Sequence, residues 1–582
     1  MPEDHEEQFM QRRLLLASVL SAVAIMVYVY AASLTAPKPA PTADEPPAIE
    51  QQAPSKASPA EPSGEPAPAA QTPAESPRQP TPGTAGTSAN DVIADAEQEL
   101  VVESATYRVT FSNRGAVVKS WILTEYEDAK GQPLELVHSA GAKKYGYPFE
   151  LVSPGGEALN DLNQALFVID GGAGRRTAPA EVIFEYATGG WIARKTFRFQ
   201  PQGYLLNLET EVRQNGEVRP HLIAWPGGFG DTTQTSDARY SQTFYYDPVA
   251  ATPVRNEAGD AADQRISNSG PFPLAGIDDL FFAAVFMTQD EQPLSLETWA
   301  IQLAPDEGAD EATFAAAAVG GSGENRFEVF LGPKSIPLLA SINPRLRQIV
   351  DFGWLSFLAL PLFYMLLWTH EHIVPNYGWA ILLVTVAINF VLFPLKWKST
   401  KSMKKMQALQ PLIKQINEKY KGLSIRDPKK AQQNEETMAL YKKYGVNPMG
   451  GCLPMLLQMP FFIAFYYVLT SAIEVRHAGW LWVEDLSRPE TLPIRVLPIA
   501  MVISQFWQQA ITPQPTVDPA QARLMKFMPL MFGFFLYEFQ SGLVLYWLTM
   551  NLVGVAQQVL LNRLPAEPLE IEQPRRRKKK KQ

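Results

Sequence analysis

Hydrophobic and polar residues alternate along the middle of the chain, from about 100 to 345. The stretches "TYRVTFSNRGAVVKSWIL" and "RKTFRFQPQGYLLNLETEVRQNG" show this period of two, and Gly, Asn and Pro occur between them. The pattern is typical of half-buried antiparallel strands joined by turns. No long helical period intervenes, so we expect residues 99–345 to form an antiparallel β-sandwich.

Long apolar runs dominate the last third of the chain, and each approaches the length of a membrane-spanning helix. Another run, Leu14–Leu34, lies near the N-terminus. Small residues at its end would suit a cleaved signal peptide, but its length favours a retained anchor within 1–34. With this anchor the pattern predicts a polytopic α-helical membrane protein of six spans. The C-terminal candidates are 376–396, 450–474, 493–512, 524–539 and 541–562.

Residues 35–98 join the anchor to the β region, and their composition differs from both. Fourteen prolines fall within 35–84, together with many Ala, Glu and Ser. Such a segment cannot bury enough apolar surface to offset its chain entropy, and proline keeps it extended. We therefore expect a disordered linker.

The charges of the loops orient the spans. Segment 396–449 has 13 Lys and Arg against four Asp and Glu, and the tail 563–582 has eight against three. By the positive-inside rule both segments are cytoplasmic, as are Arg12 and Arg13 before the anchor. Both termini are then cytoplasmic, and the β region lies on the opposite side of the membrane.

The apolar stretch within 346–375 does not fit this orientation as a further span. A span there would place either 396–449 or the β region on the wrong side of the membrane. Pro361 and aromatic residues such as Trp354 and Trp368 suit a helix at the membrane surface. We therefore expect 346–375 to contain an interfacial amphipathic helix.

The basic segment 397–449 is expected to form an antiparallel helical hairpin in the cytoplasm. Apolar residues recur at helical spacing in its first half, and Asp427 and Gly445 suit the two caps of a second helix. The hairpin is either a solvated positive loop or a docking surface for RNA-containing or anionic partners, which its capping favours. The docking residues would be Met403, Lys404, Lys405 and Met406.

Composition narrows the possible chemistry. The chain has 51 Lys and Arg against 60 Asp and Glu, one cysteine, Cys452, and six histidines. One cysteine excludes a disulfide framework or a thiolate cluster within the chain. Asp278 and Asp279 are adjacent, so on a strand they would point to opposite faces, which favours a turn or edge feature over catalysis. The sequence has no HExxH, CxxC or P-loop pattern, and it predicts neither a catalytic nor a metal site.

The interiors of the spans contain amides and lack ionisable groups, which weighs against a pump, a coupled transporter or an intramembrane protease. At ~1.5 Å per residue, amides from four spans fall between the midplane and the cytoplasmic side. They either bond neighbouring helices or line a wet cavity open to the cytoplasm, and their shared depth favours the cavity. The amides are Asn389, Gln458, Gln505, Gln508 and Asn551. Thr385 lies one turn above Asn389 on the same face, and Tyr546 and Trp547 would close the cavity above.

Several ordered motifs resemble the YidC family of membrane-protein insertases. The longest is "YGVNPMGGCLPMLLQMPFFIAFYYVL" at 444–469. The β region resembles the external domain of the bacterial members more weakly, through "FSNRGA" and "KTFRF". The other motifs are "LGPK" (331–334), "DFGW" (351–354), "FPL" (393–395), "MKKMQALQP" (403–411), "VDPAQARLMKFMPLMF" (517–532) and "SGLVLYWLTMNLVGVAQQ" (541–558).

The resemblance implies a non-enzymatic insertase and chaperone of the bacterial inner membrane, without a cofactor or a small-molecule substrate. Its five C-terminal spans would form a hydrophilic groove open to cytoplasm and lipid, and would insert and fold integral membrane proteins alone or with the Sec translocon. Implied partners are nascent membrane proteins, the Sec translocon, the ribosome and the lipid bilayer.

The resemblance also assigns contact residues. Substrate would touch Gln458, Met459, Pro460, Tyr546 and Trp547. The basic tail would bind ribosomal RNA or anionic lipid, unless it serves only orientation and solubility. The tail residues concerned are Arg575, Arg576, Arg577, Lys578 and Lys579.

Asn389 departs from the pattern of the family. Five residues before the Pro of "FPL" the family usually carries an arginine, thought to attract acidic residues of the substrate, whereas this chain has an amide. The sequence leaves open whether the groove works here through polarity alone. Two other classes of function also stay open: a transporter for an amphiphile, and a scaffold whose β region binds partners.

Overall fold

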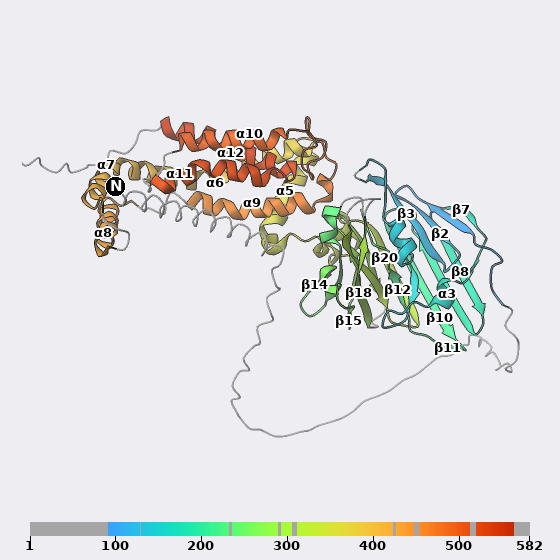
Figure 1. Cartoon of the computed structure of the whole chain (residues 1–582). Coiled ribbons are helices and arrows are strands. Elements are labelled where there is room, and N and C mark those ends of the chain that lie inside the picture. Colours follow the sequence, from blue (N-terminus) through green and yellow to red (C-terminus); the bar gives the residue numbers. More distant parts are fainter. Residues whose placement is uncertain are drawn as a thin grey trace, which may run out of the picture. The chain divides into compact units, whose positions relative to one another are not determined.

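The computed structural model describes residues 91–128, 130–231, 235–288, 293–304, 311–422, 427–446, 453–512 and 519–563. The expected anchor 1–34, nearly all of the linker 35–98 and the tail residues 564–582 lie outside these ranges. Apart from 519–525, the described residues belong to one compact unit made of 89–517 and 526–582. Along this unit the strands come first, in blue and green, and the long helices follow in yellow to red (Figure 1).

Strands β1 to β20 form three sheets. The first sheet has the order β4 (Pro133–Glu135), β3 (Val117–Glu127), β2 (Tyr107–Ser112), β1 (Glu99–Glu103), β7 (Gly174–Thr177). The second has the order β14 (Thr252–Glu257), β13 (Gln242–Asp247), β16 (Leu274–Asp278), β17 (Phe282–Thr288), β20 (Glu324–Pro333), β10 (Leu205–Gln214), β9 (Trp191–Phe199), β8 (Ala180–Thr188), β6 (Val168–Ile169), with β11 (Glu217–Val218) beside β10. The third has the order β15 (Ile266–Gly270), β18 (Leu294–Leu303), β19 (Ala312–Gly320), β12 (Leu222–Trp225), β5 (Glu150–Val152).

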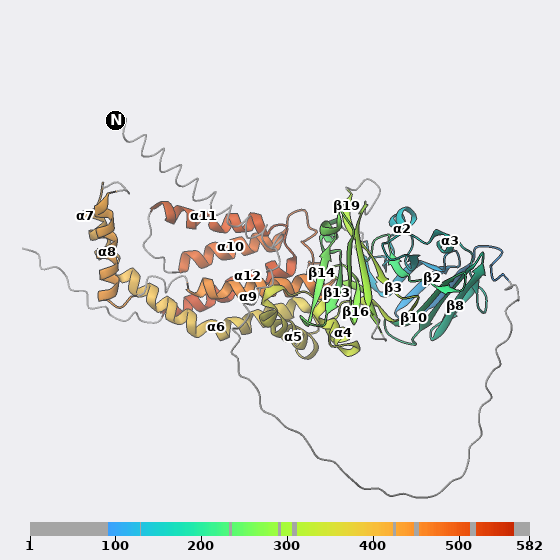
Figure 2. The same ribbon diagram turned by 90° about the horizontal axis from the view of Figure 1, so that it is seen from below.

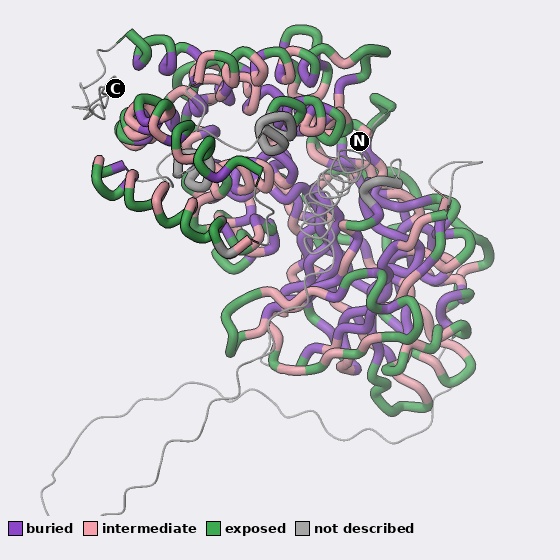
Figure 3. Tube along the Cα trace, turned by 60° about the vertical axis from the view of Figure 1, so that its left-hand side comes forward, coloured by how far each residue is buried: buried purple, intermediate pink, exposed green. Residues whose placement is uncertain are grey.

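The mostly antiparallel β architecture expected from the alternating pattern is confirmed. In β10, buried and half-buried residues alternate almost without a break, as the sequence period requires. The exception is the pairing of β1 with β7, which is parallel and sets Leu100 opposite Gly174. Buried residues, in purple, are frequent along the chain of the β region (Figure 3). Aromatic side chains such as Phe111 and Phe197 pack there with ring centroids 4.9 Å apart.

Short helices occur between the strands and among the later helices. Within the described residues the short ones are α2 (Ser139–Tyr145), α3 (Asn160–Asn163), α4 (Ile336–Ile342) and the 3-10 turns Thr235–Tyr240, Gly259–Ala261, Leu346–Ile349, Gly353–Leu355 and Ile473–Val475. The later helices are α5 (Ser356–His372), α6 (Tyr377–Ala408), α7 (Gln410–Lys419), α8 (Pro428–Lys443), α9 (Leu453–Ser471), α10 (Val496–Ile511), α11 (Pro519–Leu536) and α12 (Ser541–Arg563).

Three helical segments of the described residues are long and apolar enough to cross a membrane. They are Gly353–His372, Tyr377–Ala408 and Ser541–Arg563, and shorter apolar helices occupy Val496–Ile511 and Lys526–Leu536. Helix α6 continues twelve residues beyond the expected end of its span at 396. The count of six spans stays a prediction.

Helix α5 lacks the polar face that an amphipathic helix would have. Leu362 and Leu366 are buried on one side, whereas Phe357 and Trp368, on the other, are 74% and 54% exposed. The amphipathic part of the expectation for 346–375 is therefore wrong, because both sides of the helix are apolar. A position along the membrane surface stays a prediction.

Helices α7 and α8 pack against each other beyond the end of α6 (Figure 2). Leu409 interrupts the helix between α6 and α7, directly before the Gln410–Pro411 start of α7. At α8 the Asp427 side chain accepts the Lys429 N–H at 2.9 Å, so the predicted N-cap is confirmed. Gly445 follows α8 with φ of 60°, the left-handed conformation expected of a C-terminal cap. The cytoplasmic location of this hairpin stays a prediction.

Candidate functional site

Helix α12 contacts α6, α9 and α10, and buried residues occur along it from Ser541 to Leu561. Two glycines let neighbouring elements approach its backbone. A Cβ at Gly542 would lie 2.9 Å from the Leu486 carbonyl oxygen, and a Cβ at Gly554 would collide with the Gln508 side chain. Small residues at close helix contacts are typical of packing within membranes.

Polar side chains of α6, α10 and α12 gather around Gly554. We call Asn389, Lys396, Gln508 and Gln557 the inner polar cluster. Gln557 Nε2 donates to the Asn389 backbone carbonyl at 3.2 Å. Lys396 Nζ donates to Gln557 Oε1 at 3.0 Å and to the Gly554 carbonyl at 3.4 Å. Because Gln508 approaches Gly554 from α10, the cluster brings three helices together at one level.

The Asn389 side chain bonds along its own helix. Its Nδ2 donates to the Thr385 carbonyl at 2.9 Å, and the Thr385 hydroxyl donates to the Ile381 carbonyl at 2.6 Å. Thr385 is fully buried and Asn389 is 8% exposed. The two residues share one face, as the helical spacing predicts, and the face is turned into the helix packing. Asn389 thus contributes its backbone carbonyl to the cluster, whereas its side-chain amide donates within α6.

The remaining predicted amides make separate contacts between helices. Asn551 Nδ2 donates to Ser504 Oγ at 3.0 Å and joins α12 to α10. Gln458 on α9 contacts the sulfur of Met550 on α12. Gln505 Oε1 is buried and has no hydrogen-bond partner among the described residues. A buried acceptor of this kind costs about 1–3 kcal/mol when it stays unpaired.

The predicted contact residues of α9 and α12 differ in exposure. On α9, Met459 is 44% exposed and Pro460 is half-buried. On α12, Tyr546 is 1% exposed and stacks on Phe465 with ring centroids 4.7 Å apart, whereas Trp547 is half-buried. The Tyr546 ring belongs to the packed core of this arrangement, and its contact with substrate stays a prediction.

Three residues of these contacts, Lys396, Gln557 and Ser504, are not among those predicted from the sequence. Lys396 stands directly after "FPL" and was counted with the basic loop, although it follows Asn389 by seven residues, which is two helical turns on the same face. Gln557 was overlooked beside Gln558, whose Nε2 donates to Asn562 Oδ1 at 2.9 Å. Helical spacing from Asn389 was the signal that would have found Lys396.

The hairpin residues fall into two groups. Met406 is 3% exposed and packs with Leu409, Ile413 and Tyr441 in a small apolar core between the helices. The expectation that Met406 offers an adaptable exposed surface is therefore wrong, because this core is what holds the hairpin together. Met403, Lys404 and Lys405 are half-buried, and Lys404 Nζ donates to the Leu561 carbonyl at 2.6 Å. The tail residues 575–579 lie outside the described residues.

Asp278 and Asp279 stabilise the turn between β16 and β17, as the sequence analysis expected. Asp279 Oδ1 accepts the N–H groups of Phe281 and Phe282 at 2.8 and 2.6 Å. Asp278 forms a buried ion pair with Lys334 at 2.7 Å. Burial raises the pKa of Asp279 to about 6. Because these carboxylates are occupied by the turn and by Lys334, the pair is structural.

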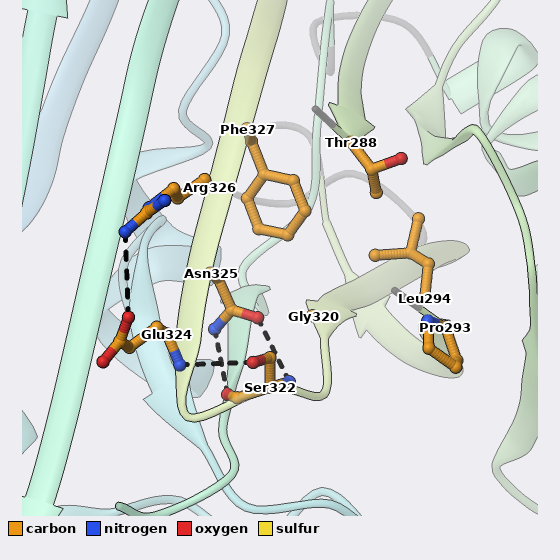
Figure 4. Close-up of a pocket in the computed structure, with 9 residues that line it drawn as sticks. All are labelled: Thr288, Pro293, Leu294, Gly320, Ser322, Glu324, Asn325, Arg326 and Phe327. Atoms are coloured by element: carbon orange, nitrogen blue, oxygen red, sulfur yellow. Dashed lines mark hydrogen bonds and ion pairs between the residues drawn. The ribbon is translucent and has the colours of Figure 1, made fainter. Parts of the chain in front are cut away.

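A small hollow in the β region is lined by polar and apolar groups at the ends of β17, β18, β19 and β20 (Figure 4). Its polar side chains are engaged locally: Asn325 Oδ1 accepts the Ser322 N–H at 3.2 Å, and Arg326 pairs with Glu324 at 3.8 Å. No group of three or more His, Cys, Asp or Glu suited to a metal ion occurs in the part of the chain that the structure describes. The polar groups between the membrane helices are therefore the candidate site. The residues lining the hollow are Thr288, Pro293, Leu294, Gly320, Ser322, Glu324, Asn325, Arg326 and Phe327.

Comparison with known proteins covers nearly the whole described chain. The family described as "YidC periplasmic domain" matches residues 99–365, and the family "60Kd inner membrane protein" matches 368–567. A membrane protein insertase YidC of Polynucleobacter asymbioticus is 32% identical over 82% of this chain and 86% of its own length. That of Syntrophus aciditrophicus is 33% identical over 95% of this chain and its full length. The chain belongs to the YidC family.

Among solved structures, a crystal structure of an active YidC insertase with its first transmembrane domain resolved covers 80% of this chain and 94% of its own, at 21% identity and a TM-score of 0.35. YidC proteins are inner-membrane proteins, and the two family matches divide this chain within α5, between residues 365 and 368. The β region thus matches the periplasmic domain of the family, and α6 to α12 lie within the match to the 60Kd inner membrane protein family.

Proposed function

We propose that this protein inserts and folds integral membrane proteins in the inner membrane, and that the inner polar cluster marks the path of the substrate. This proposal rests on the observation that polar side chains of α6, α10 and α12 meet inside a group of otherwise apolar helices. Family membership supplies the class of substrate, because the relatives are membrane protein insertases.

A polar path between these helices would lower the main barrier to insertion. The polar flank of a nascent segment carries backbone and side-chain groups that are costly to place in hydrocarbon without hydrogen-bond partners. Amides such as Gln505, whose buried oxygen has no partner in the part of the chain that the structure describes, would offer hydrogen bonds partway across the bilayer. The apolar part of the segment then partitions into lipid, which drives the step without bond cleavage or a cofactor.

The proposed function also implies which partners this protein would bind. The hairpin of α7 and α8 and the basic tail would face the cytoplasm and receive the ribosome or the emerging chain. The Sec translocon would act beside this protein for substrates with long translocated domains. For hydrophobic contact we assign Met459 on α9, which is 44% exposed, together with half-buried Pro460 and Trp547.

Reconstitution tests the proposed function directly. Purified full-length protein in liposomes should insert a short single-span substrate without ATP or a membrane potential, measured by protection of the translocated end from protease. Empty liposomes give the background, and liposomes with an unrelated six-span protein control for membrane disturbance. Insertion no greater than either background would refute insertase function and leave an amphiphile transporter or a scaffold.

A further inference from the structure

The loop between α9 and α10 contains a tight hairpin turn with two exposed apolar side chains. The Trp480 N–H donates to the Val483 carbonyl at 2.8 Å, and the Val483 N–H donates to the Trp480 carbonyl at 2.8 Å. Trp480 and Val483 are buried, whereas Leu481 and Trp482 between them are 65% and 42% exposed. We call Leu481 and Trp482 the hairpin tip.

The base of this hairpin is fixed against the beginning of α6. Asn376 Nδ2, at the N-cap of α6, donates to the Gly479 carbonyl at 2.9 Å. The Trp480 ring meets the Trp379 ring edge-on, with centroids 5.6 Å apart. A Cβ at Gly378 would overlap the Trp480 ring, so the loop and the helix are in close contact. The exposure of the tip therefore belongs to a well-packed loop, and the tip lies at the end of the helices where α6 begins.

The backbone of the tip favours a different kind of residue from the one present. Leu481 has φ of 52°, in the left-handed region, which glycine or asparagine adopts at lower cost than a large apolar residue. A strained backbone together with an exposed apolar side chain is unfavourable in water on both counts. The combination indicates a surface that contacts something other than water.

Exposed apolar residues continue from the hairpin onto two of the apolar helices. Trp379, which touches the base of the hairpin, is exposed near the start of α6. Ile494 and Val496 are exposed where the same loop leads into α10. Since α6 and α10 lie within the match to an inner-membrane protein family, the surface that covers these helix starts is lipid. The tip continues this lipid-facing surface.

The chemistry of the tip suits the interface between lipid and water. Tryptophan is enriched at this level because its ring is apolar and its N–H is polar. Trp482 Nε1 donates to Glu490 Oε1 at 2.6 Å, so its polar group is satisfied within the loop. Glu484, which follows Trp482 by two residues, is exposed and accepts the Thr491 hydroxyl at 3.2 Å. This carboxylate limits the depth of the loop, because a charge is costly in the hydrocarbon core.

We propose that the hairpin tip inserts into the interfacial region of the bilayer, with lipid as its partner. In the orientation predicted from the loop charges, the leaflet concerned is the periplasmic one. Leu481 and Trp482 lie among the headgroups and the first part of the acyl chains, and Glu484 stays at the level of the headgroups. The contact holds the loop, and with it the start of α10, at a defined depth.

Fluorescent labels test this contact with the full chain in phosphatidylcholine nanodiscs. Cys452→Ser removes the single cysteine, and Leu481→Cys then carries an environment-sensitive dye. Part of the lipid carries a nitroxide quencher near its headgroup, and iodide is the quencher in water. The matched control is Val249→Cys, because Val249 is an apolar residue at an exposed turn between β13 and β14.

The dye at position 481 should be quenched by the nitroxide lipid, and iodide should quench it several-fold less than the dye at position 249. A dye in Glu484→Cys should be quenched by both, because this position borders the headgroups and water. A second measurement leaves the tip unlabelled. The tryptophan emission of the unaltered protein minus that of Trp482→Phe gives the emission of Trp482, and brominated lipid should quench this difference.

Two results would overturn the inference. Equal iodide quenching at positions 481 and 249, without quenching by the nitroxide lipid, would place the tip in water. Shielding of position 481 from both quenchers would mean that protein covers the tip, such as the anchor within 1–34 or a second copy of the chain. Insertion of substrate is measured separately, so neither result bears on the proposed function.

Discussion

The Arg476 guanidinium donates a hydrogen bond to the Asp231 carboxylate at 2.6 Å, and both side chains are 3% exposed. Asp231 follows β12 in the periplasmic domain, whereas Arg476 follows α9 in the membrane part. The guanidinium also lies over the rings of Phe281 and Phe282, 5.5 and 5.4 Å from their centroids. This buried pair therefore links two segments that are 245 residues apart.

Arg476→Gln should destabilise the folded protein, because it removes the cationic partner of the buried Asp231 carboxylate. Loss of one member of a buried pair costs about 3–5 kcal/mol. The measurement is the free energy of unfolding of the full chain in detergent. The matched control is Arg198→Gln, which breaks exposed pairs with Glu181 and Glu209 and should cost about 0–1 kcal/mol. Similar small losses in both variants would contradict the link.

His221 should make the periplasmic domain sensitive to acid. Its Nδ1 faces the Arg219 carbonyl at 3.1 Å and carries the proton, so Nε2 accepts from Thr210 Oγ1 at 2.7 Å and Asn325 Nδ2 at 3.0 Å. Burial lowers the pKa of His221 to about 4. An unfolded chain takes up this proton near pH ~6.5, whereas the folded chain does not until about pH 4.

The stabilisation that the neutral His221 side chain gives the folded state is therefore complete above pH ~6.5. It is lost as the pH falls toward about 4, and the loss reaches up to about 3 kcal/mol. The free energy of unfolding of the full chain, measured across this pH range, should change less steeply with pH in His221→Gln, because glutamine does not titrate. The variant is expected to be less stable at neutral pH, so the slope with pH is the readout. Identical slopes would show that His221 is not held neutral.

Met406→Ala should loosen the hairpin of α7 and α8. The side chain is 3% exposed in the small apolar core, and its loss costs about 2–5 kcal/mol of local stability. Amide hydrogen exchange in α7 and α8 measures this opening. Met438→Ala on α8 is the control, because Met438 is 56% exposed and its loss should change stability by less than about 0.5 kcal/mol. Equal hydrogen exchange in the two variants would show that Met406 does not belong to the core that stabilises the hairpin.

Asn389→Leu should impair insertion more than Asn389→Arg. Leucine leaves the Thr385 carbonyl without the side-chain donor at 2.9 Å and makes this level of the path apolar. Arginine keeps donors and adds a charge near the one that Lys396 supplies. Initial rates of insertion into liposomes compare the three proteins. Equal rates would mean that Asn389 serves only packing.

For this chain, the helices and strands can be predicted from the sequence better than the surroundings of individual side chains. Alternation and apolar length gave the β region and the positions of α6 to α12, because both depend on local period and composition. The inner polar cluster depends on which faces of three helices meet, which no local pattern encodes. Helical spacing places Lys396 on the same face as Asn389, but it does not show which faces of α10 and α12 meet that face. Met406 and Tyr546 are likewise enclosed by residues distant in sequence.

Gly554 brings the main chain of α12 within reach of side chains from two other helices. A Cβ there would collide with the end of the Gln508 side chain and lie 3.2 Å from Lys396 Nζ, so both flexible side chains would have to turn away. The missing side chain leaves a peptide oxygen of α12 accessible to the ammonium. That acceptor belongs to the main chain and is retained whatever side chain stands at 554. A larger residue would therefore change which side chains reach the oxygen, and it would leave the oxygen itself in place.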